Sequence, residues 1–262
     1  MRGTDGMDVH PRVAVNSISS LNQSLAADLA LWNDLGIESV GIITPKLDDA
    51  GWDVGREAIL DSGLRVSSTS CYEEEIAQTV ELTHELGANV LYIVSGTAGG
   101  LSWEDAAAKF CQDTAPVVAR AKELGVTLAV EPTNPLRSDV SFVYSVRDAI
   151  DLGRMADMGI CVDFYSAWYE RGLEELVRKN IDLVALVQIC DYKVGTFDIP
   201  NRRAVGDGDI PVEALMAMVL DAGYEGVFEL EILGPEIEAE GYRAPIVRSV
   251  ERASAMLDRL GA

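Results

Sequence analysis

The chain alternates short apolar runs with helix-like segments along almost its whole length, and this rhythm constrains the fold most. Eight runs are typical of buried strands: RVAVNSI, ESVGIIT, RVSSTS, NVLYIVS, VTLAVEP, GICVDF, LVALVQI and GVFELEI. Helix-like segments lie between and after them, among others near 24–35, 54–62, 74–86, 103–124 and 244–260. Glycines that can end a helix precede several of the strands, as in LGI, LGA, LGV and AGYEG. Eight βα units without a break in composition predict one (β/α)8 barrel over residues 1–262, with 1–11 as a flexible N-terminus.

A doubly wound open sheet is the competing architecture for such an alternation. That fold usually places a glycine-rich phosphate turn directly after its first strand. Here the first strand is followed by NSISSLNQS, which has no glycine. GTAGG at 96–100 follows the fourth strand and does not fit the GxGxxG pattern, so we interpret it as a flexible loop.

Four polar side chains end the last four apolar runs: Glu131, Asp163, Gln188 and Glu231. The strands of a parallel barrel end on one face, so these side chains should converge there. Any one of them alone is more often structural, but three carboxylates and an amide together favour a hard cation such as Mg²⁺ or Mn²⁺. Glu229 shares a strand face with Glu231 and is the alternative ligand if that strand ends two residues earlier.

Composition excludes several classes of protein. The 262 residues carry a net charge of −22 and show no basic stripe, which argues against nucleic-acid binding. The acidity is interpreted as a means of solubility. No apolar run reaches the roughly 18 residues that a membrane span needs, and MRGTDGMDVHPR does not resemble a secretory signal. The four cysteines show no CxxC spacing, and two of them, Cys161 and Cys190, lie in strand-like runs, which predicts a reducing, cytoplasmic environment.

The second half of the chain resembles a known superfamily. The segments LAVEPTNP, CVDFYSAW, VQICDYKVG, NRRAVGDGDIPVEAL and GYEGVFELEI, in this order, resemble the xylose isomerase-like TIM barrels. That group includes sugar-phosphate isomerases and epimerases, inosose dehydratase and related endonucleases. The branch that looks closest, with EPxxP, VQxCD and GDGxI, includes subunits implicated in carbon-glycoside cleavage. The first half matches only in its βα rhythm.

The resemblance implies a divalent metal held by Glu131, Asp163, Gln188 and Glu231. Gln188 stands where many members have histidine, which would weaken any preference for nitrogen-loving metals. Ser166 also stands where many members have histidine. The chain has only two histidines, His10 and His84, and neither is assigned a catalytic role. Their scarcity and the negative charge argue against a multi-zinc endonuclease.

Further residues near these strand ends are candidates for substrate binding. Arg202 and Arg203, just before GDGD, would hold substrate hydroxyls or a phosphate, or would form a solvated loop pair. Tyr165 and Trp168 follow Asp163 and would line an apolar substrate wall or pack the outside of their loop. Asn134 is a weaker candidate.

The sequence therefore predicts a metal-dependent isomerase, epimerase or dehydratase-type lyase that acts on a keto sugar or keto-polyol. Mn²⁺ or Mg²⁺ would polarise a carbonyl and its neighbouring hydroxyl, and Glu131 or Glu231 would remove the proton between them to give an enediolate. One alternative is a carbon-glycoside-cleaving subunit that acts on a 3-keto glycoside with a small partner subunit. The other is a degenerate, non-catalytic ligand-binding barrel, which the presence of Gln188 and Ser166 motivates. A homo-oligomer and a small partner subunit both remain open.

Overall fold

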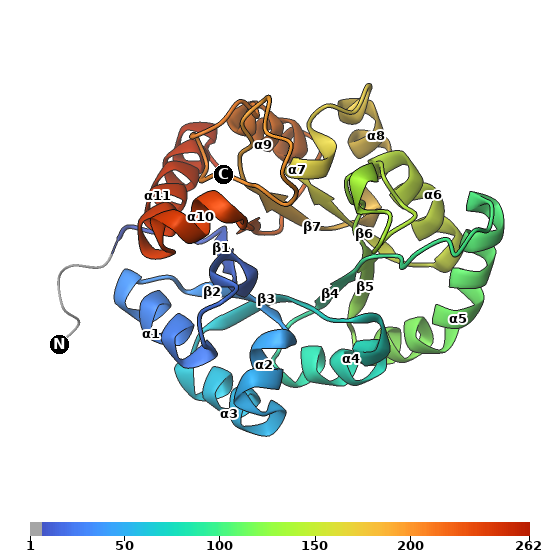
Figure 1. Ribbon diagram of the computed structural model, residues 1–262, viewed down its shortest axis with the longest axis horizontal. Helices are drawn as coiled ribbons and strands as arrows, with labels where there is room; N and C mark the ends of the chain where they lie inside the picture. Colours follow the sequence, from blue (N-terminus) through green and yellow to red (C-terminus); the bar gives the residue numbers. More distant parts are fainter. Residues whose placement is uncertain (1–6) are drawn as a thin grey trace.

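The computed structural model describes residues 7–262, and within them eight parallel strands close into a barrel (Figure 1). The strands are joined in sequence order, and the last pairs with the first. This confirms the predicted (β/α)8 architecture and excludes the doubly wound sheet. The strands are β1 (Val13–Asn16), β2 (Ser39–Ile43), β3 (Arg65–Ser70), β4 (Val90–Ile93), β5 (Thr127–Val130), β6 (Gly159–Asp163), β7 (Val184–Ile189) and β8 (Phe228–Leu230).

Helices surround the barrel on its outer side (Figure 1). Each of the five helical ranges expected from the sequence contains a helix. The helices are α1 (Leu25–Leu35), α2 (Pro45–Ala50), α3 (Trp52–Ser62), α4 (Ile76–Glu85), α5 (Trp103–Glu123), α6 (Val146–Ala156), α7 (Phe164–Ala167), α8 (Leu173–Lys179), α9 (Val212–Asp221), α10 (Pro235–Glu240) and α11 (Arg243–Leu260). Three short ones, α2, α7 and α10, lie in segments that follow strand ends and were not predicted.

Local chemistry explains where several helices begin and end. The side chain of Ser24 accepts a hydrogen bond from the backbone of Ala27 at the start of α1, and Ser102 does the same for Asp105 in α5. Gly36 ends α1 with a left-handed backbone, at φ 72°. Glycines in the three other predicted helix-ending segments also have positive φ. These signals set the βα rhythm that places the strand ends.

The apolar core lies mainly between the strands and the helices. Trp32 of α1 and Phe228 of β8 are among its largest fully buried side chains. A second, smaller cluster fills the inside of the barrel with residues from β4 to β7, including Tyr92 and Leu186. Cys161 also belongs to this interior cluster, and all four cysteines are free thiols. The predicted burial of Cys161 and Cys190 is confirmed.

The described part of the N-terminal segment contacts the barrel. The backbone N–H of Met7 donates to Leu35, and that of His10 donates to the Ser254 hydroxyl at 3.0 Å. Residues 1–6, which the predicted flexible terminus includes, lie outside the described residues. Within residues 7–262, none of the helices has the length and apolar character needed to cross a membrane.

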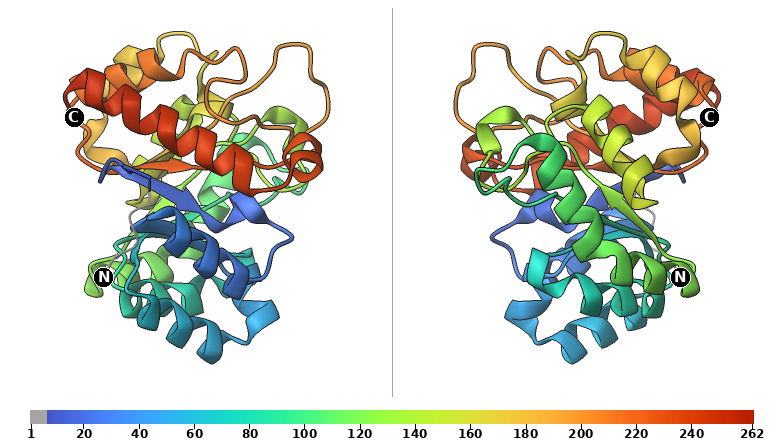
Figure 2. Two further views of the ribbon diagram at one scale, coloured as in Figure 1. Left: turned by 90° about the vertical axis from the view of Figure 1, so that its left-hand side faces the viewer. Right: turned by 90° about the vertical axis from the view of Figure 1, so that its right-hand side faces the viewer.

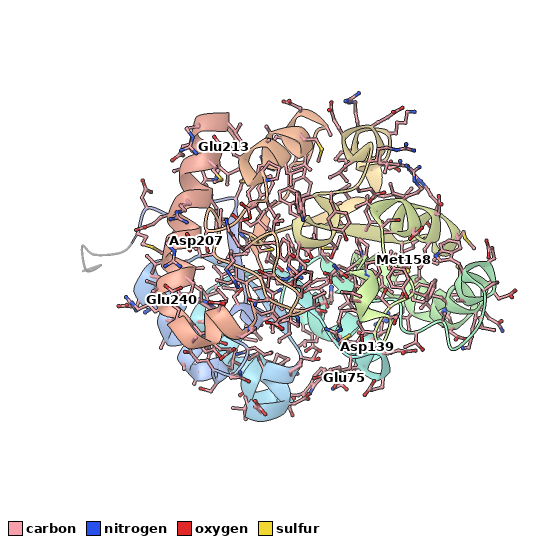
Figure 3. All side chains as sticks on the ribbon, turned by 45° about the horizontal axis from the view of Figure 1, so that its top comes forward. Glu75, Asp139, Met158, Asp207, Glu213 and Glu240 are labelled. Carbon is pink, nitrogen blue, oxygen red and sulfur yellow. The ribbon has the colours of Figure 1, made fainter. Side chains whose placement is uncertain are left out.

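Many acidic residues on the outside pair with arginines. Asp207 and Glu240, both labelled in Figure 3, lie within 2.8 Å of Arg248, and Glu213 pairs with Arg259 at 2.8 Å. Exposed pairs of this kind contribute little to stability. These acidic side chains on the outer surface are therefore each balanced locally by an arginine.

Candidate functional site

The four predicted residues lie at the carboxyl ends of four neighbouring strands. Asp163 is the last residue of β6 and is in register with Gln188, the penultimate residue of β7. Glu131 directly follows β5, and Glu231 directly follows β8. All four are buried, with Glu131 the most exposed at 7%. The structure thus brings them to one face of the barrel, as the sequence predicts.

A guanidinium group lies between two of these carboxylates. Arg202 Nη2 lies 3.0 Å from Asp163 Oδ2 and 2.9 Å from Glu231 Oε1. Its Nη1 donates to Asp163 Oδ1 and to the backbone oxygen of Glu231, both at 3.2 Å. Arg202 is only 7% exposed, so the solvated-loop interpretation is wrong for this residue.

The loop between β7 and α9 delivers Arg202 to the mouth and projects from the barrel as an orange segment (Figure 2). Arg203 pairs with Asp191 through two backbone hydrogen bonds, and the N–H of Arg202 donates to Leu233 at 2.9 Å. Successive residues of an extended segment point to opposite sides. Arg202 therefore points inward, while Arg203 turns outward to Glu236 at 3.4 Å.

The Asp191 carboxylate holds this loop in place. It accepts hydrogen bonds from the backbone N–H groups of Gly206 and Ile210, at 3.0 and 2.9 Å. Gly208 lies so close to it that a Cβ there would be 2.3 Å from the carboxylate. The GDG segment thus wraps around Asp191, and this contact fixes the path of the chain that carries Arg202.

Glu231 also accepts hydrogen bonds from side chains inside the barrel. The Gln188 amide nitrogen donates to Glu231 Oε2 at 2.6 Å, and the Tyr92 hydroxyl donates to the same oxygen at 3.4 Å. The amide oxygen of Gln188 accepts from the thiol of Cys161 at 3.3 Å. In this arrangement Gln188 presents its nitrogen to Glu231, and a half-turn of the amide would present its oxygen instead.

Glu131 is the least compensated group of the site. Among residues 7–262, no hydrogen bond or ion pair reaches its carboxylate from another side chain. Burial raises its pKa well above the usual value, and the charges of Glu231 and Asp163 raise it further. Burial also raises the pKa of Glu231 to about 7, opposed by Arg202 and assisted by Asp163.

A second carboxylate of β8, Glu229, lies deeper in the barrel. It accepts hydrogen bonds from Ser67 at 2.6 Å, from Asn16 at 2.7 Å and from Ser68 at 2.8 Å. Gly41 of β2 leaves room for this group, because a Cβ there would lie 2.7 Å from the Glu229 carboxylate. Glu229 does not line the mouth cavity, whereas Glu131, Arg202 and Glu231 do.

The carboxylates at the mouth have the donor atoms that a divalent ion needs, but they are not grouped as its ligands. As they stand, no three His, Cys, Asp or Glu side chains among residues 7–262 are grouped closely enough to hold a metal. Their chemistry nevertheless fits: three carboxylates, Glu131, Asp163 and Glu231, face a single guanidinium, and all the donors are hard oxygens. Ionised, they leave an excess of two negative charges, which matches Mg²⁺ or Mn²⁺.

The mouth cavity has a volume of about 220 Å³ and lies next to an aromatic cavity. The neighbouring cavity, of about 250 Å³, shares Asn134, Tyr165 and Ile199 with it. Trp168 and Phe197 also line it, and Phe197 is 89% exposed. The sequence identified Asn134, Tyr165 and Trp168, but it gave no signal for Phe197, which lies on the loop after β7.

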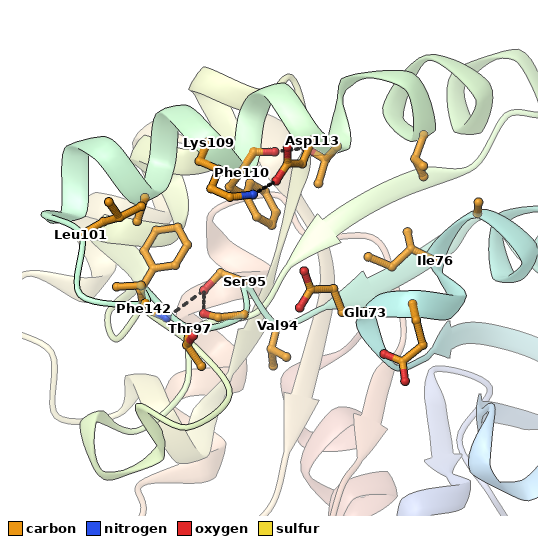
Figure 4. A pocket seen from close by; sticks show the side chains of 18 residues that line it. Glu73, Ile76, Val94, Ser95, Thr97, Leu101, Lys109, Phe110, Asp113 and Phe142 are labelled. Carbon is orange, nitrogen blue, oxygen red and sulfur yellow. Dashed lines mark hydrogen bonds and ion pairs between the residues drawn. The ribbon is translucent and has the colours of Figure 1, made fainter.

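A larger cavity, of about 590 Å³, lies beside the mouth cavity, and Val94 lines both. Figure 4 shows Glu73 and Ile76 on one side of it, and Lys109 and Phe110 of α5 on the other. GTAGG, predicted to be a flexible loop, forms part of its wall. The sequence could not indicate this cavity, because its walls come from separate loops and helices.

Comparisons with known proteins agree with the barrel fold. The sequence model of the family described as xylose isomerase-like TIM barrel matches residues 29–258. A sequence comparison with curated proteins gives no significant match. Among solved structures, the IolI protein with a bound zinc atom is 17% identical, with a TM-score of 0.80 over 95% of this chain and 99% of that one.

Two sugar epimerases are also similar in structure. L-ribulose 3-epimerase is 20% identical, with a TM-score of 0.76 over 95% of each chain. The apo form of 3-keto-D-glucoside 4-epimerase from E. coli is 18% identical, with a TM-score of 0.70 over 90% of this chain and 97% of that one. At these identities the likeness shows the fold alone.

Proposed function

Because this chain belongs to the xylose isomerase-like TIM-barrel family, we propose that it is a divalent-metal-dependent isomerase or epimerase acting on a keto sugar or keto-polyol. The observation that carries the proposal is the excess of buried carboxylate charge at the barrel mouth. Active sites of such barrels lie at this face. Buried like charges with raised pKa values are costly to stability and cluster at functional sites.

Glu131, Asp163, Gln188 and Glu231 would hold one Mn²⁺ or Mg²⁺ ion. When bound, the ion would polarise a carbonyl and the adjacent hydroxyl of the substrate. Glu131 or Glu231 would act as the general base that removes the proton between them. Return of the proton to the other carbon or the other face gives isomerisation or epimerisation, and loss of a β-substituent gives a lyase.

The substrate would be oriented by residues that line the two neighbouring cavities. Arg202 and Tyr165 line the mouth, and Trp168 lines the aromatic cavity beside it. Asn134 borders both, although its side chain already accepts a hydrogen bond from the backbone of Leu136. Arg203 points outward, so it would contact only a substrate that extends past the loop after β7.

The aromatic cavity favours a second candidate function, the cleavage of a carbon glycoside. A 3-keto sugar ring would occupy the mouth, and an apolar aglycone would lie against Trp168 and Phe197. The exposed Phe197 would then be covered by the aglycone or by a small partner subunit. The same carboxylates would start this reaction, because elimination also begins with removal of the proton beside the carbonyl.

A degenerate, non-catalytic barrel accounts less well for the mouth. Gln188 and Ser166 depart from the histidines common in the family, but Gln188 still offers an oxygen donor. Within residues 7–262, Glu131 is buried without a side-chain hydrogen bond, an unfavourable arrangement that a bound ion would compensate.

The test is the exchange of hydrogen for deuterium beside a substrate carbonyl. Chelator-treated protein is given keto sugars and keto-inositols in D₂O, with and without Mn²⁺ or Mg²⁺, and followed by NMR. We expect metal-dependent exchange, reduced about 10²-fold or more in Glu131→Gln, the matched variant that keeps shape and loses charge. Metal-loaded wild type that exchanges no substrate in the panel would contradict the proposal.

A further inference from the structure

We propose that Arg202 is a resident counter-ion, which competes with the divalent ion for the carboxylates of Asp163 and Glu231 and withdraws from them when the ion binds. The inference rests on the metal site of the proposed function. It goes further in making metal binding an exchange of one cation for another. It also makes the position of Arg202 depend on whether the ion is bound.

The geometry of the guanidinium carries the inference. A single nitrogen, Nη2, lies 3.0 Å from Asp163 Oδ2 and 2.9 Å from Glu231 Oε1. Asp163 and Glu231 are two of the residues that would hold the ion, so the guanidinium engages carboxylate oxygens that the ion would need as ligands. Two positive groups in this small buried volume would also repel each other strongly.

The charges around Arg202 explain why a cation must be present in either state. Removal of the guanidinium alone would leave Asp163, Glu131 and Glu231 together without any compensating charge. A guanidinium group stays protonated in proteins, so Arg202 supplies a positive charge at this position. Arg202 therefore keeps the site formed without metal.

The surroundings give Arg202 a way to withdraw. Among residues 7–262, its Nε has no hydrogen-bond partner, so the end of the side chain is held by the Nη atoms. Its guanidinium lies over the Tyr165 ring, 4.6 Å from the ring centre, and Arg202 already lines the mouth cavity. Rotation of the side chain would move the charge into that cavity while its backbone bond to Leu233 stays intact.

This exchange couples the metal to the substrate. With the ion bound, the displaced guanidinium would lie in the mouth, where it can donate to an oxygen of the substrate. Without the ion, the same group is engaged by Asp163 and Glu231. The metal would thus release a substrate-binding group, and Arg202 would reduce the affinity for the metal.

The experiment is a calorimetric titration of chelator-stripped full-length protein with MnCl₂. Arg202→Met removes the charge but keeps much of the side-chain volume, and Arg203→Met is the matched control on the next residue. We expect Arg202→Met to bind Mn²⁺ about tenfold or more tightly than wild type, within the range typical of coupling between two sites. Arg203→Met should bind as wild type does.

Thermal unfolding provides a second readout that does not depend on activity. In EDTA, Arg202→Met should unfold at a lower temperature than wild type, and Mn²⁺ should raise its unfolding temperature by more than it raises that of wild type. If Arg202→Met does not fold, Arg202→Gln, which is neutral but still donates hydrogen bonds, takes its place.

The outcomes separate this inference from the proposed function. If wild type binds one Mn²⁺ and the Arg202 variants bind it equally or less tightly, Arg202 is not a competitor of the metal and the inference is wrong. If neither wild type nor the variants bind Mn²⁺, the metal site of the proposed function fails as well.

Discussion

Glu229 on β8 and Glu231 just after it lie two residues apart and are almost equally buried, yet their surroundings differ in kind. Glu229, inside the barrel, is surrounded by the neutral donors Ser67, Ser68 and Asn16. Glu231, at the mouth, contacts the charged Arg202 and the amide of Gln188. Two further carboxylates, Glu131 and Asp163, lie near Glu231.

We interpret Glu229 as a carboxylate that supports the barrel and Glu231 as part of the proposed ligand site. Burial raises the pKa of both, but hydrogen bonds from Ser67, Asn16 and Ser68 counteract this at Glu229. At the mouth, Arg202 faces the carboxylates of Asp163 and Glu231, and within residues 7–262 Glu131 has no side-chain hydrogen bond. The proposed metal site rests on this imbalance of charge.

The largest expected contrast is in turnover. Glu231→Gln should reduce the exchange of substrate hydrogen by about 10²-fold or more, because it removes a ligand and a candidate base. Glu229→Gln should reduce it by less than about tenfold, since Glu229 faces the interior. NMR measures the rates, and circular dichroism checks that both variants keep the fold. Equal losses in the two variants would remove the distinction between them.

Stability should show the reverse order. Glu229→Leu should lower the free energy of unfolding by about 4 kcal/mol, because Asn16, Ser67 and Ser68 lose a buried acceptor. Glu231→Leu should cost less in the metal-free protein, since it also relieves repulsion from Asp163 and Glu131. Urea unfolding in EDTA compares the two. A larger loss in Glu231→Leu would show that the mouth carboxylate is the structural one.

The metal-free protein should become less stable as the pH rises from about 5 to 7. The pKa of Glu231 is about 7 in the folded state, against an ordinary 4.5, so the folded state binds more protons within this range. By linkage, the stability present below pH 4.5 is lost progressively, by up to about 3 kcal/mol. Urea unfolding at several pH values measures it, and Glu231→Gln should flatten the dependence. A slope of opposite sign would contradict the raised pKa.

The smallest expected effect concerns Gln188, whose amide nitrogen donates a hydrogen bond to Glu231. Gln188→His should still bind metal, with the preference moving by roughly tenfold from Mg²⁺ towards Mn²⁺, Co²⁺ or Zn²⁺, because imidazole favours these ions. Gln188→Leu should lose affinity because a donor is gone. Calorimetric titration of both variants with Mg²⁺, Mn²⁺ and Co²⁺ provides the comparison. Unchanged binding by Gln188→Leu would exclude Gln188 as a ligand.

The barrel and the four strand-end residues could be predicted because both depend on local rules. The alternation of strands and helices sets the fold, and parallel strands bring Glu131 and Glu231 to one face. The position of Arg202 could not be predicted, because it depends on the backbone pairing of Arg203 with Asp191 and on the long loop after β7. The same holds for Glu229, whose donors Ser67 and Asn16 reach it from other strands of the barrel.

The most direct test of the account is the number of divalent ions that the mouth binds. Chelator-stripped wild type, Glu231→Gln and Glu229→Gln would be titrated with Mn²⁺ by calorimetry, and the bound metal counted by elemental analysis. The account predicts one ion per chain in wild type and in Glu229→Gln, and strongly weakened binding in Glu231→Gln. No stoichiometric uptake by wild type, or equal binding by both variants, would contradict it.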